Sequence, residues 1–347
     1  RMRRVVSLPS AIFLAGMIAV FSATLLFRAA SANDSEKELK AQAEALLAKS
    51  HDLSNIEAPG SPAFTLMATI HYQIGTQTAD GDGQVVWLAP GHYQETFSAP
   101  GYAYKEIAQD GKLYLSRTDN QMPLLMYELN RIILTAMDSG KALDGKVKEA
   151  KTASSAAGQA ITCAKMKPRG LSLTACLDND GDIATIESNW PSGVSALDAV
   201  YEFSGFVGFG TKRFPQKLVF RGGDGHTIEI AIGSISSATD TSQEFRPPVG
   251  SVVEDWCAEP KIEADASHAA TLPWVPLTPL SGIQASFYVV VGPGGRARSV
   301  TLIHTTQKIS DKDIQTWIGT ARFPVHSCGD AGLEYQMELS MQMGLPQ

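Results

Sequence analysis

The sequence predicts an α+β protein in which a curved antiparallel sheet with helices is followed by a small β-β-α-β domain. Three observations support this. Between residues 64 and 117, short partly alternating runs are broken by Gly-containing turns at roughly ten-residue intervals, as in an antiparallel meander. A strongly apolar helical run at 123–137 needs a large apolar surface to cover it. Proline-punctuated segments then precede the last part of the chain.

The composition limits the function classes. The chain has 347 residues, of which 44% are hydrophobic and 19% charged, so one or two ordered domains are expected. It carries 29 basic and 36 acidic side chains, a net charge of −7, and therefore lacks the basic footprint of a nucleic-acid-binding protein. We expect no nucleic-acid partner.

The N-terminal residues carry an export signal. Arg1, Arg3 and Arg4 precede an uncharged stretch at 5–27, and Ala30-Ser31-Ala32 has the small-x-small pattern of a signal-peptidase site. Residues 1–32 are therefore predicted to be a signal peptide, with a retained membrane anchor as the alternative. The strongly apolar part, residues 11–27, is shorter than the ~20 residues of a spanning helix, which favours cleavage.

The first domain is expected at residues 33–257. Ser35 and Glu38 form a capping box that begins a helix ending near Ser50, and the meander follows at 64–117. The helix from Pro123 to Met137 is expected to lie against the concave face of the sheet. Further strands are expected at 159–164, 171–177, 182–189, 199–208, 213–221 and 226–236.

A linker at 258–280 and a second domain at 281–347 complete the chain. Strands are expected at 284–291 and 297–304, and a helix with Ser310 or Asp311 as N-cap ends before Phe323. The closing strand, 333–341, alternates apolar and polar residues, so one face is expected to be buried. If it lies at a sheet edge, it can accept an extended peptide, unless the linker or a second copy covers it. The partner-binding candidates are Leu333, Glu334, Tyr335, Gln336, Met337, Glu338 and Leu339.

Four cysteines in a chain with a predicted export signal favour disulfides. Cys163 and Cys176 flank a turn-rich connector, so facing positions of one hairpin would bring them together. Cys257 would then pair with Cys328. The spacing does not fit a zinc site, because there is no C-x-x-C or H-x-x-x-H motif.

Motifs of catalysis and metal binding are weak. The Gly140–Lys146 segment has phosphate-loop spacing, but Val147 replaces the Ser or Thr that would hold magnesium. Residues 178–182, Asp-Asn-Asp-Gly-Asp, indicate a hairpin turn, with a weak surface calcium site as the alternative. No G-x-S-x-G motif is present. We predict no enzyme activity, no catalytic residues, no metal site and no cofactor.

Aromatic and methionine side chains are the candidates for ligand binding. They could line an apolar cavity in the curved sheet, or they could simply be core. The groove candidates are Tyr93, Phe97, Tyr102, Tyr104, Tyr114, Met122 and Met126.

Two family resemblances follow from particular segments. The C-terminal residues, with Val289-Val290-Val291-Gly292-Pro293-Gly294-Gly295, a helix and Arg322-Phe323-Pro324, resemble the C-terminal domain of TonB. Residues 35–257 resemble the outer-membrane lipoprotein carrier (LolA-like) fold, an unclosed antiparallel barrel with helices in its mouth. The segments that carry this second resemblance are Phe64-x-Leu66, Tyr93-x-Glu95-x-Phe97, Lys112-Leu113-Tyr114 and Arg213-Phe214-Pro215-x-Lys217.

The resemblances imply a function at the cell envelope. They imply localisation in the periplasm, an apolar groove for a lipid-like or acyl ligand, and a C-terminal module that docks on an envelope protein by strand pairing. The first hypothesis is therefore an exported carrier of a hydrophobic ligand. The alternative is a TonB-like adaptor or energy transducer acting on an outer-membrane receptor.

Overall fold

The structure is a computed structural model. It describes residues 35–74, 76–118, 123–137, 143, 145–155, 158–167, 172–189, 198–223, 225–238, 245–258, 260–262, 283–306 and 308–343. The predicted signal peptide at 1–32, the groove candidate Met122 and most of the predicted linker lie outside these residues. None of the helices in the described ranges is both long and apolar enough to cross a membrane.

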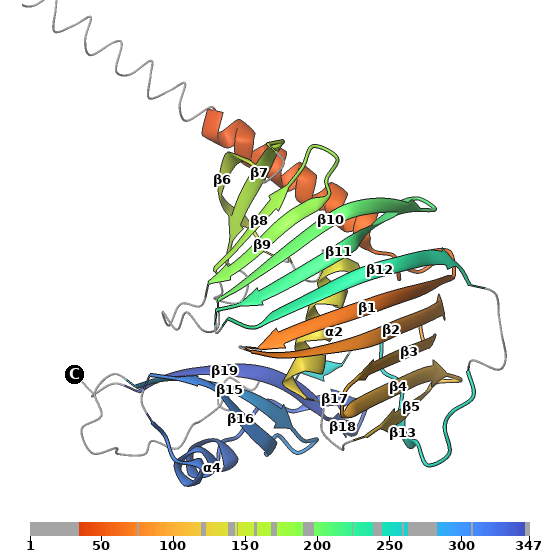
Figure 1. Ribbon diagram of the computed structural model, residues 1–347, viewed down its shortest axis with the longest axis vertical. Helices are drawn as coiled ribbons and strands as arrows, with labels where there is room; N and C mark the ends of the chain where they lie inside the picture. Colours follow the sequence, from red (N-terminus) through yellow and green to blue (C-terminus); the bar gives the residue numbers. More distant parts are fainter. Residues whose placement is uncertain are drawn as a thin grey trace, which may run out of the picture.

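One large antiparallel sheet dominates the molecule (Figure 1). The strand order is β13-β5-β4-β3-β2-β1-β12-β11-β10-β9-β8-β7-β6, and its edge strands β13 and β6 do not pair with each other, so within the described residues the sheet is unclosed. The strands are β1 Phe64–Ile74, β2 Gln77–Ala89, β3 His92–Ala99, β4 Tyr102–Gln109, β5 Lys112–Arg117, β6 Val147–Ser154, β7 Ala160–Met166, β8 Ser172–Leu177, β9 Ile183–Asn189, β10 Ala199–Phe209, β11 Lys212–Gly222, β12 Thr227–Ser237 and β13 Val252–Asp255.

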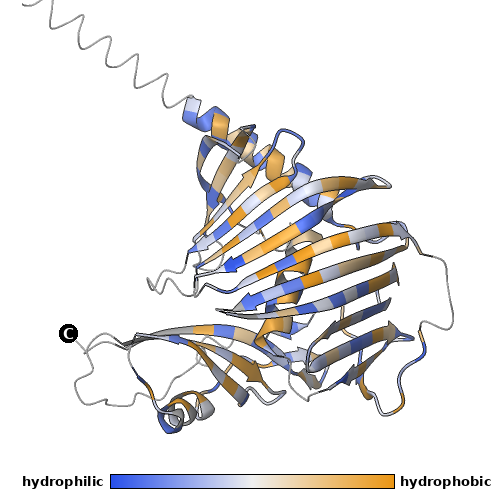
Figure 2. Ribbon diagram, viewed as in Figure 1, coloured by the Kyte–Doolittle hydropathy of each residue, from blue (hydrophilic) through white to orange (hydrophobic). Residues whose placement is uncertain are grey.

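Two helices cover the concave face of this sheet. Helix α2, Leu124–Met137, buries Met126, Leu129 and Ile132 against the strands, as the apolar run predicts. The N-terminal helix, residues 35–54, buries Ala43 and Leu46 in the same core. Figure 2 shows apolar residues along α2 where it lies against the sheet. The predicted curved antiparallel sheet with helices is confirmed.

The C-terminal unit comprises residues 283–343. Its strands β15 Ile283–Val291, β16 Ala297–Thr305 and β19 Tyr335–Met343 pair in the order β16-β15-β19, and helix α4, Asp311–Gly319, packs on one face. Ser310 caps α4, because its Oγ accepts a hydrogen bond from the backbone N–H of Asp313 at 3.2 Å. The order of elements follows the expectation, whereas the boundary between two domains stays a prediction.

Three short strands were not expected in this region. They are β14 Lys261–Ile262, β17 His326–Cys328 and β18 Ala331–Leu333, which pair in the order β14-β17-β18. The closing strand therefore begins at Tyr335 rather than at Leu333, since Leu333 pairs with His326 in the β17–β18 hairpin. Glu334 lies between the two strands.

Both predicted disulfides are present. Cys163 and Cys176 are register partners on β7 and β8, as the hairpin argument requires. Cys257 and Cys328, 71 residues apart in sequence, connect the segment after β13 to β17. The second bridge thus ties the C-terminal unit to the edge of the large sheet.

Candidate functional site

The concave face gathers most of the predicted groove residues. Phe97, Tyr102, Tyr104 and Met126 belong to one buried cluster, and each is at most 8% exposed. Tyr93 is half-buried and packs against the same cluster. In this structure these side chains are therefore core, and a ligand would have to displace part of that packing.

Tyr114 lies on the opposite face of the sheet. Its neighbours in β5, Leu113 and Leu115, contact the concave core, so alternation turns Tyr114 the other way. There it packs on a separate cluster that contains Ile107 and Phe245. It does not join the other aromatic candidates.

An acidic group lies among the aromatic residues, and the sequence reasoning did not select it. The Tyr93 hydroxyl donates to Oε1 of Glu106 at 2.6 Å, and the Tyr104 hydroxyl donates to Oε2 of the same carboxylate. Glu95 is the register partner of Glu106 on the neighbouring strand. Burial, followed by the nearby carboxylates of Glu106 and Glu57, raises the pKa of Glu95 well above its usual value.

A signal for this group was present in the sequence. Tyr93, Glu95 and Phe97 alternate along one strand, so a carboxylate had to share a face with two aromatic groove candidates. Tyr104 and Glu106 repeat the pattern on the next strand.

A buried polar pair fixes α2 to the sheet. Oε2 of Glu128 on α2 lies 2.7 Å from Nε2 of His226, which precedes β12, and both side chains are 5% exposed. The His226 ring packs against the rings of Phe220 and Tyr72, with centroid distances of 5.0 and 6.4 Å. This pair is a polar contact between α2 and the sheet, next to the apolar contacts of the same helix.

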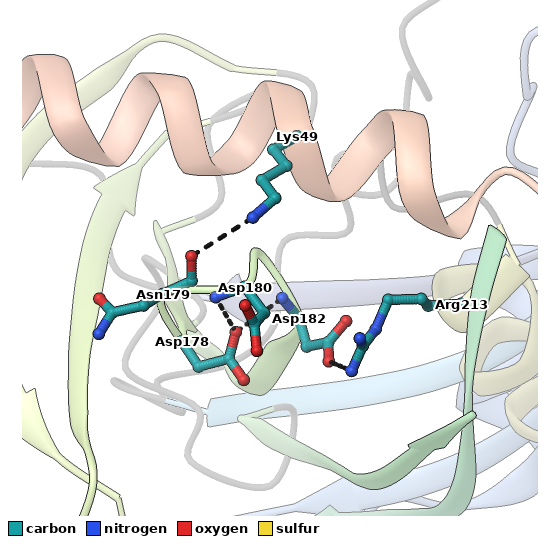
Figure 3. Close-up of polar contacts among 6 residues, drawn as sticks. All are labelled: Lys49, Asp178, Asn179, Asp180, Asp182 and Arg213. Atoms are coloured by element: carbon teal, nitrogen blue, oxygen red, sulfur yellow. Dashed lines mark hydrogen bonds and ion pairs between the residues drawn. The ribbon is translucent and has the colours of Figure 1, made fainter. Parts of the chain in front are cut away.

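The β8–β9 turn lies beneath the N-terminal helix (Figure 3). Lys49 Nζ donates to the carbonyl of Asn179 at 3.4 Å. Asp178 Oδ1 accepts the backbone N–H groups of Asp180 and Asp182 at 2.9 and 3.0 Å. The predicted hairpin turn is confirmed. Among the described residues, no group of three or more His, Cys, Asp or Glu side chains is placed to hold a metal ion.

Asp182 and Arg213 form an ion pair next to this turn. Arg213 Nη2 donates to Oδ2 of Asp182 at 2.5 Å, and the Asp182 side chain is 5% exposed. Burial raises the pKa of Asp182, although the guanidinium of Arg213 opposes the rise. The pair joins the turn before β9 to the start of β11.

The predicted partner-binding strand has its apolar side chains turned toward its own unit. Tyr335, Met337 and Leu339 pack on the core beneath α4. Glu334 forms ion pairs with Arg298 at 2.7 Å and with Arg117 of the large sheet at 3.6 Å. Strand β19 nevertheless lies at an edge, because in the described residues it pairs only with β15.

Solved structures similar to this chain include a LolA superfamily protein, a DUF1329 family protein and a MucA/MucB complex. The LolA superfamily protein from Nitrosomonas europaea is 9% identical, with TM-score 0.40, and the match covers 58% of this chain and 96% of that chain. The DUF1329 family protein from Desulfovibrio piger is 9% identical, with TM-score 0.44 and the same coverage. The MucA/MucB complex from Pseudomonas aeruginosa matches 83% of this chain and 93% of that chain, at 10% identity and TM-score 0.23.

No protein-family model matches the sequence, and no curated protein matches it. The resemblances to the LolA-like fold and to the TonB C-terminal domain therefore stay predictions.

Proposed function

We propose that the chain is an exported cell-envelope protein that binds a hydrophobic, lipid-like ligand on the concave face of its large sheet. One observation carries this proposal: in the described part of the chain, helices rather than a second sheet cover the apolar face of a sheet whose two edge strands do not pair. A helix can shift as a unit, and an acyl chain that takes its place restores the buried apolar area.

The two disulfides support export. Disulfides persist in oxidising compartments such as the periplasm, and all four cysteines are paired. The N-terminal signal pattern supports the same localisation.

Binding of a defined lipid tests the proposal. The purified full chain is titrated with lysophosphatidylethanolamine, and native mass spectrometry records the complexes. We expect saturable binding, and no binding of glycerophosphoethanolamine, which has the same head group without the chain. Absence of saturable lysolipid binding would overturn the carrier function.

A docking role for β19 is the second candidate, and its edge position favours it. A free edge offers unpaired N–H and C=O groups to an extended peptide, such as a segment of an outer-membrane receptor. Gln336→Pro and Glu338→Pro each remove one backbone donor and keep the apolar face. If both variants stay folded by circular dichroism and retain an envelope partner at unchanged affinity, strand addition at β19 is the wrong mechanism.

A further inference from the structure

Strands β9 and β10 of the large sheet separate beyond Glu202, and we call this separation the parting. In the described part of the chain, β10 pairs with β9 only over Ala199–Glu202, whereas its pairing with β11 continues to Phe209. Gly205, with φ of 68°, lies just beyond the last pair with β9. A positive φ at this position suits glycine and accompanies the departure of β10 from β9.

Two cavities meet at this parting. An outer cavity of about 740 Å³ lies over β6–β10, and a narrow inner crevice of about 20 Å³ lies between the N-terminal helix, α2 and β9–β11. Asp182, Phe203, Phe206 and Arg213 line both. These four side chains therefore form the boundary between the outside of the sheet and its helix-covered side.

The Asp182–Arg213 ion pair spans the parting. Asp182 precedes β9 and Arg213 belongs to β11, while β10 lies between these strands in the sheet order (Figure 3). Separating the two side chains would open the boundary without breaking any backbone pairing of the sheet. Arg213 Nε is buried and, in the described residues, has no hydrogen-bond partner, so this guanidinium retains an unused donor beside the cavities.

The two cavities have different chemistry. Carboxylates exceed cations around the outer cavity once ion pairs are set aside. Asp182 is paired with Arg213, and Glu202 is paired with Arg221 at 3.1 Å, which leaves Asp178 and Glu187 to face Lys151. Such a lining favours a head group that carries an ammonium. The inner crevice contains Leu53, Ala136 and Ile183 in addition to the phenylalanines, and this lining favours a hydrocarbon.

We propose that the parting between β9 and β10 is the route by which a single-chain amphiphile with an ammonium-bearing head group reaches the concave side. The head group rests in the outer cavity, and the tail passes the Asp182–Arg213 pair into the inner crevice. This inference rests on the proposed function and names the ligand class and its route. The inner crevice has room for about one water, so the tail enters only as the ion pair separates and the apolar side chains shift.

Photocrosslinking locates the tail. The full chain is incubated with lysophosphatidylethanolamine that carries a diazirine at the end of its acyl chain, and crosslinked peptides are mapped by mass spectrometry. We expect crosslinks at Leu53, Ala136 or Phe203. Crosslinks confined to Phe97 and Tyr104 would overturn the route and leave the carrier function intact. No saturable binding at all would overturn both.

A blocking variant tests the route independently. Ser204 is exposed and lines the outer cavity, so Ser204→Trp narrows the opening without entering the core. Ser234 is exposed on β12 and is not among the residues that line either cavity, which makes Ser234→Trp the matched control. We expect Ser204→Trp to slow lysolipid association about tenfold, which corresponds to an increase of about 1.4 kcal/mol in the activation free energy. We expect Ser234→Trp to leave the association rate unchanged. Equal association rates for the two variants would overturn the route.

Two further comparisons test the ion pair and the head group. Asp182→Asn keeps the shape of the side chain and removes its charge, so association should become several-fold faster. Replacing the ethanolamine head group by glycerol should weaken binding about tenfold, since the ammonium is lost. An unchanged association rate for Asp182→Asn would contradict the role of the ion pair. An unchanged affinity for the lipid with the glycerol head group would contradict the ammonium preference.

Discussion

Glu128 on α2 and His226 at the start of β12 form the buried polar link between the helix and the sheet, with 2.7 Å between Oε2 and Nε2. Met126, Leu129 and Ile132 add apolar contacts between α2 and the core. Apolar contacts hold a helix against a sheet but fix its position weakly, whereas a buried contact between two polar side chains favours one register. The apolar residues therefore select the face of α2 that packs on the sheet, and the Glu128–His226 pair favours one position of that face.

Removing one partner should destabilise the fold strongly. Glu128→Ala leaves His226 buried without its carboxylate, and the expected loss is about 3–5 kcal/mol in the free energy of unfolding. The double variant Glu128→Leu/His226→Phe replaces both polar groups by apolar ones of similar size and should recover most of that loss. Urea unfolding followed by circular dichroism measures both. A double variant that is less stable than Glu128→Ala would contradict this assignment.

The pH dependence of stability should reflect Glu95. Its pKa is raised in the folded protein, so between its ordinary pKa and the raised value the folded state binds more protons than the unfolded state. Stability from this group is therefore fully present at low pH and falls as pH rises through that window, with a slope of at most about 1.4 kcal/mol per pH unit for one proton.

Glu95→Gln should remove this dependence. The amide cannot ionise, so the variant should gain stability relative to the wild type as pH rises above the ordinary pKa of a glutamate. Urea midpoints measured from pH 4 to pH 8 provide the comparison, and Glu149→Gln on the exposed edge strand β6 is the control. A Glu95→Gln profile parallel to that of the wild type would show that Glu95 does not titrate in this window.

The two disulfides should differ in their contributions. In the chain-entropy description a bridge stabilises by restricting the unfolded chain, and the effect grows with loop length. The Cys163–Cys176 bridge closes a short loop and should contribute about 3 kcal/mol, whereas the Cys257–Cys328 bridge spans 71 residues and should contribute about 4 kcal/mol. Paired Cys→Ser variants, compared in urea, measure each. A larger loss from the local bridge would contradict the entropic explanation.

Periodicity and turn residues predicted most of the fold. The turns at Pro90-Gly91, Pro100-Gly101 and Asp110-Gly111 marked the meander, and the apolar run after Pro123 marked α2. The break expected at Asp80-Gly81-Asp82-Gly83 was wrong, because these residues pair with β1 inside β2. Strands β6 and β13 were missed, because each is a sheet edge with little apolar alternation. Lys148 and Glu149 in β6, for example, are exposed.

The site was less predictable, for physical reasons. Composition identified aromatic residues but did not assign faces, so Tyr114 was grouped with side chains on the other side of the sheet. The Asp182–Arg213 pair joins residues 31 positions apart across a parted sheet, and no local pattern encodes such a contact. Strand β15 is buried on both faces, and the sequence analysis did not predict this. A strand covered on both sides loses the alternation of apolar and polar residues that would assign its faces.

That strand leads to the last prediction, which concerns how the C-terminal unit docks. Ser286, Tyr288 and Val290 lie on the face of β15 that points away from α4, and all three are at most 2% exposed. The Tyr288 ring lies 5.3 Å from the ring of Tyr127 on α2, so this face is covered by the large sheet and its helix. Arg117 and Glu334 add an ion pair of 3.6 Å at the same contact.

Tyr288→Ala should therefore separate the two parts while leaving each folded. The lost aromatic packing is worth about 3–5 kcal/mol, and the Cys257–Cys328 bridge keeps the unit attached. We expect a larger radius of gyration by small-angle X-ray scattering, with the far-ultraviolet circular dichroism spectrum nearly unchanged. Tyr288→Phe, which loses only the hydroxyl, is the control and should keep the compact form. If Tyr288→Ala stays as compact as the wild type, the contact between β15 and α2 does not hold the two parts together. The Arg117–Glu334 ion pair, the disulfide and the β14–β17 pairing would then be sufficient.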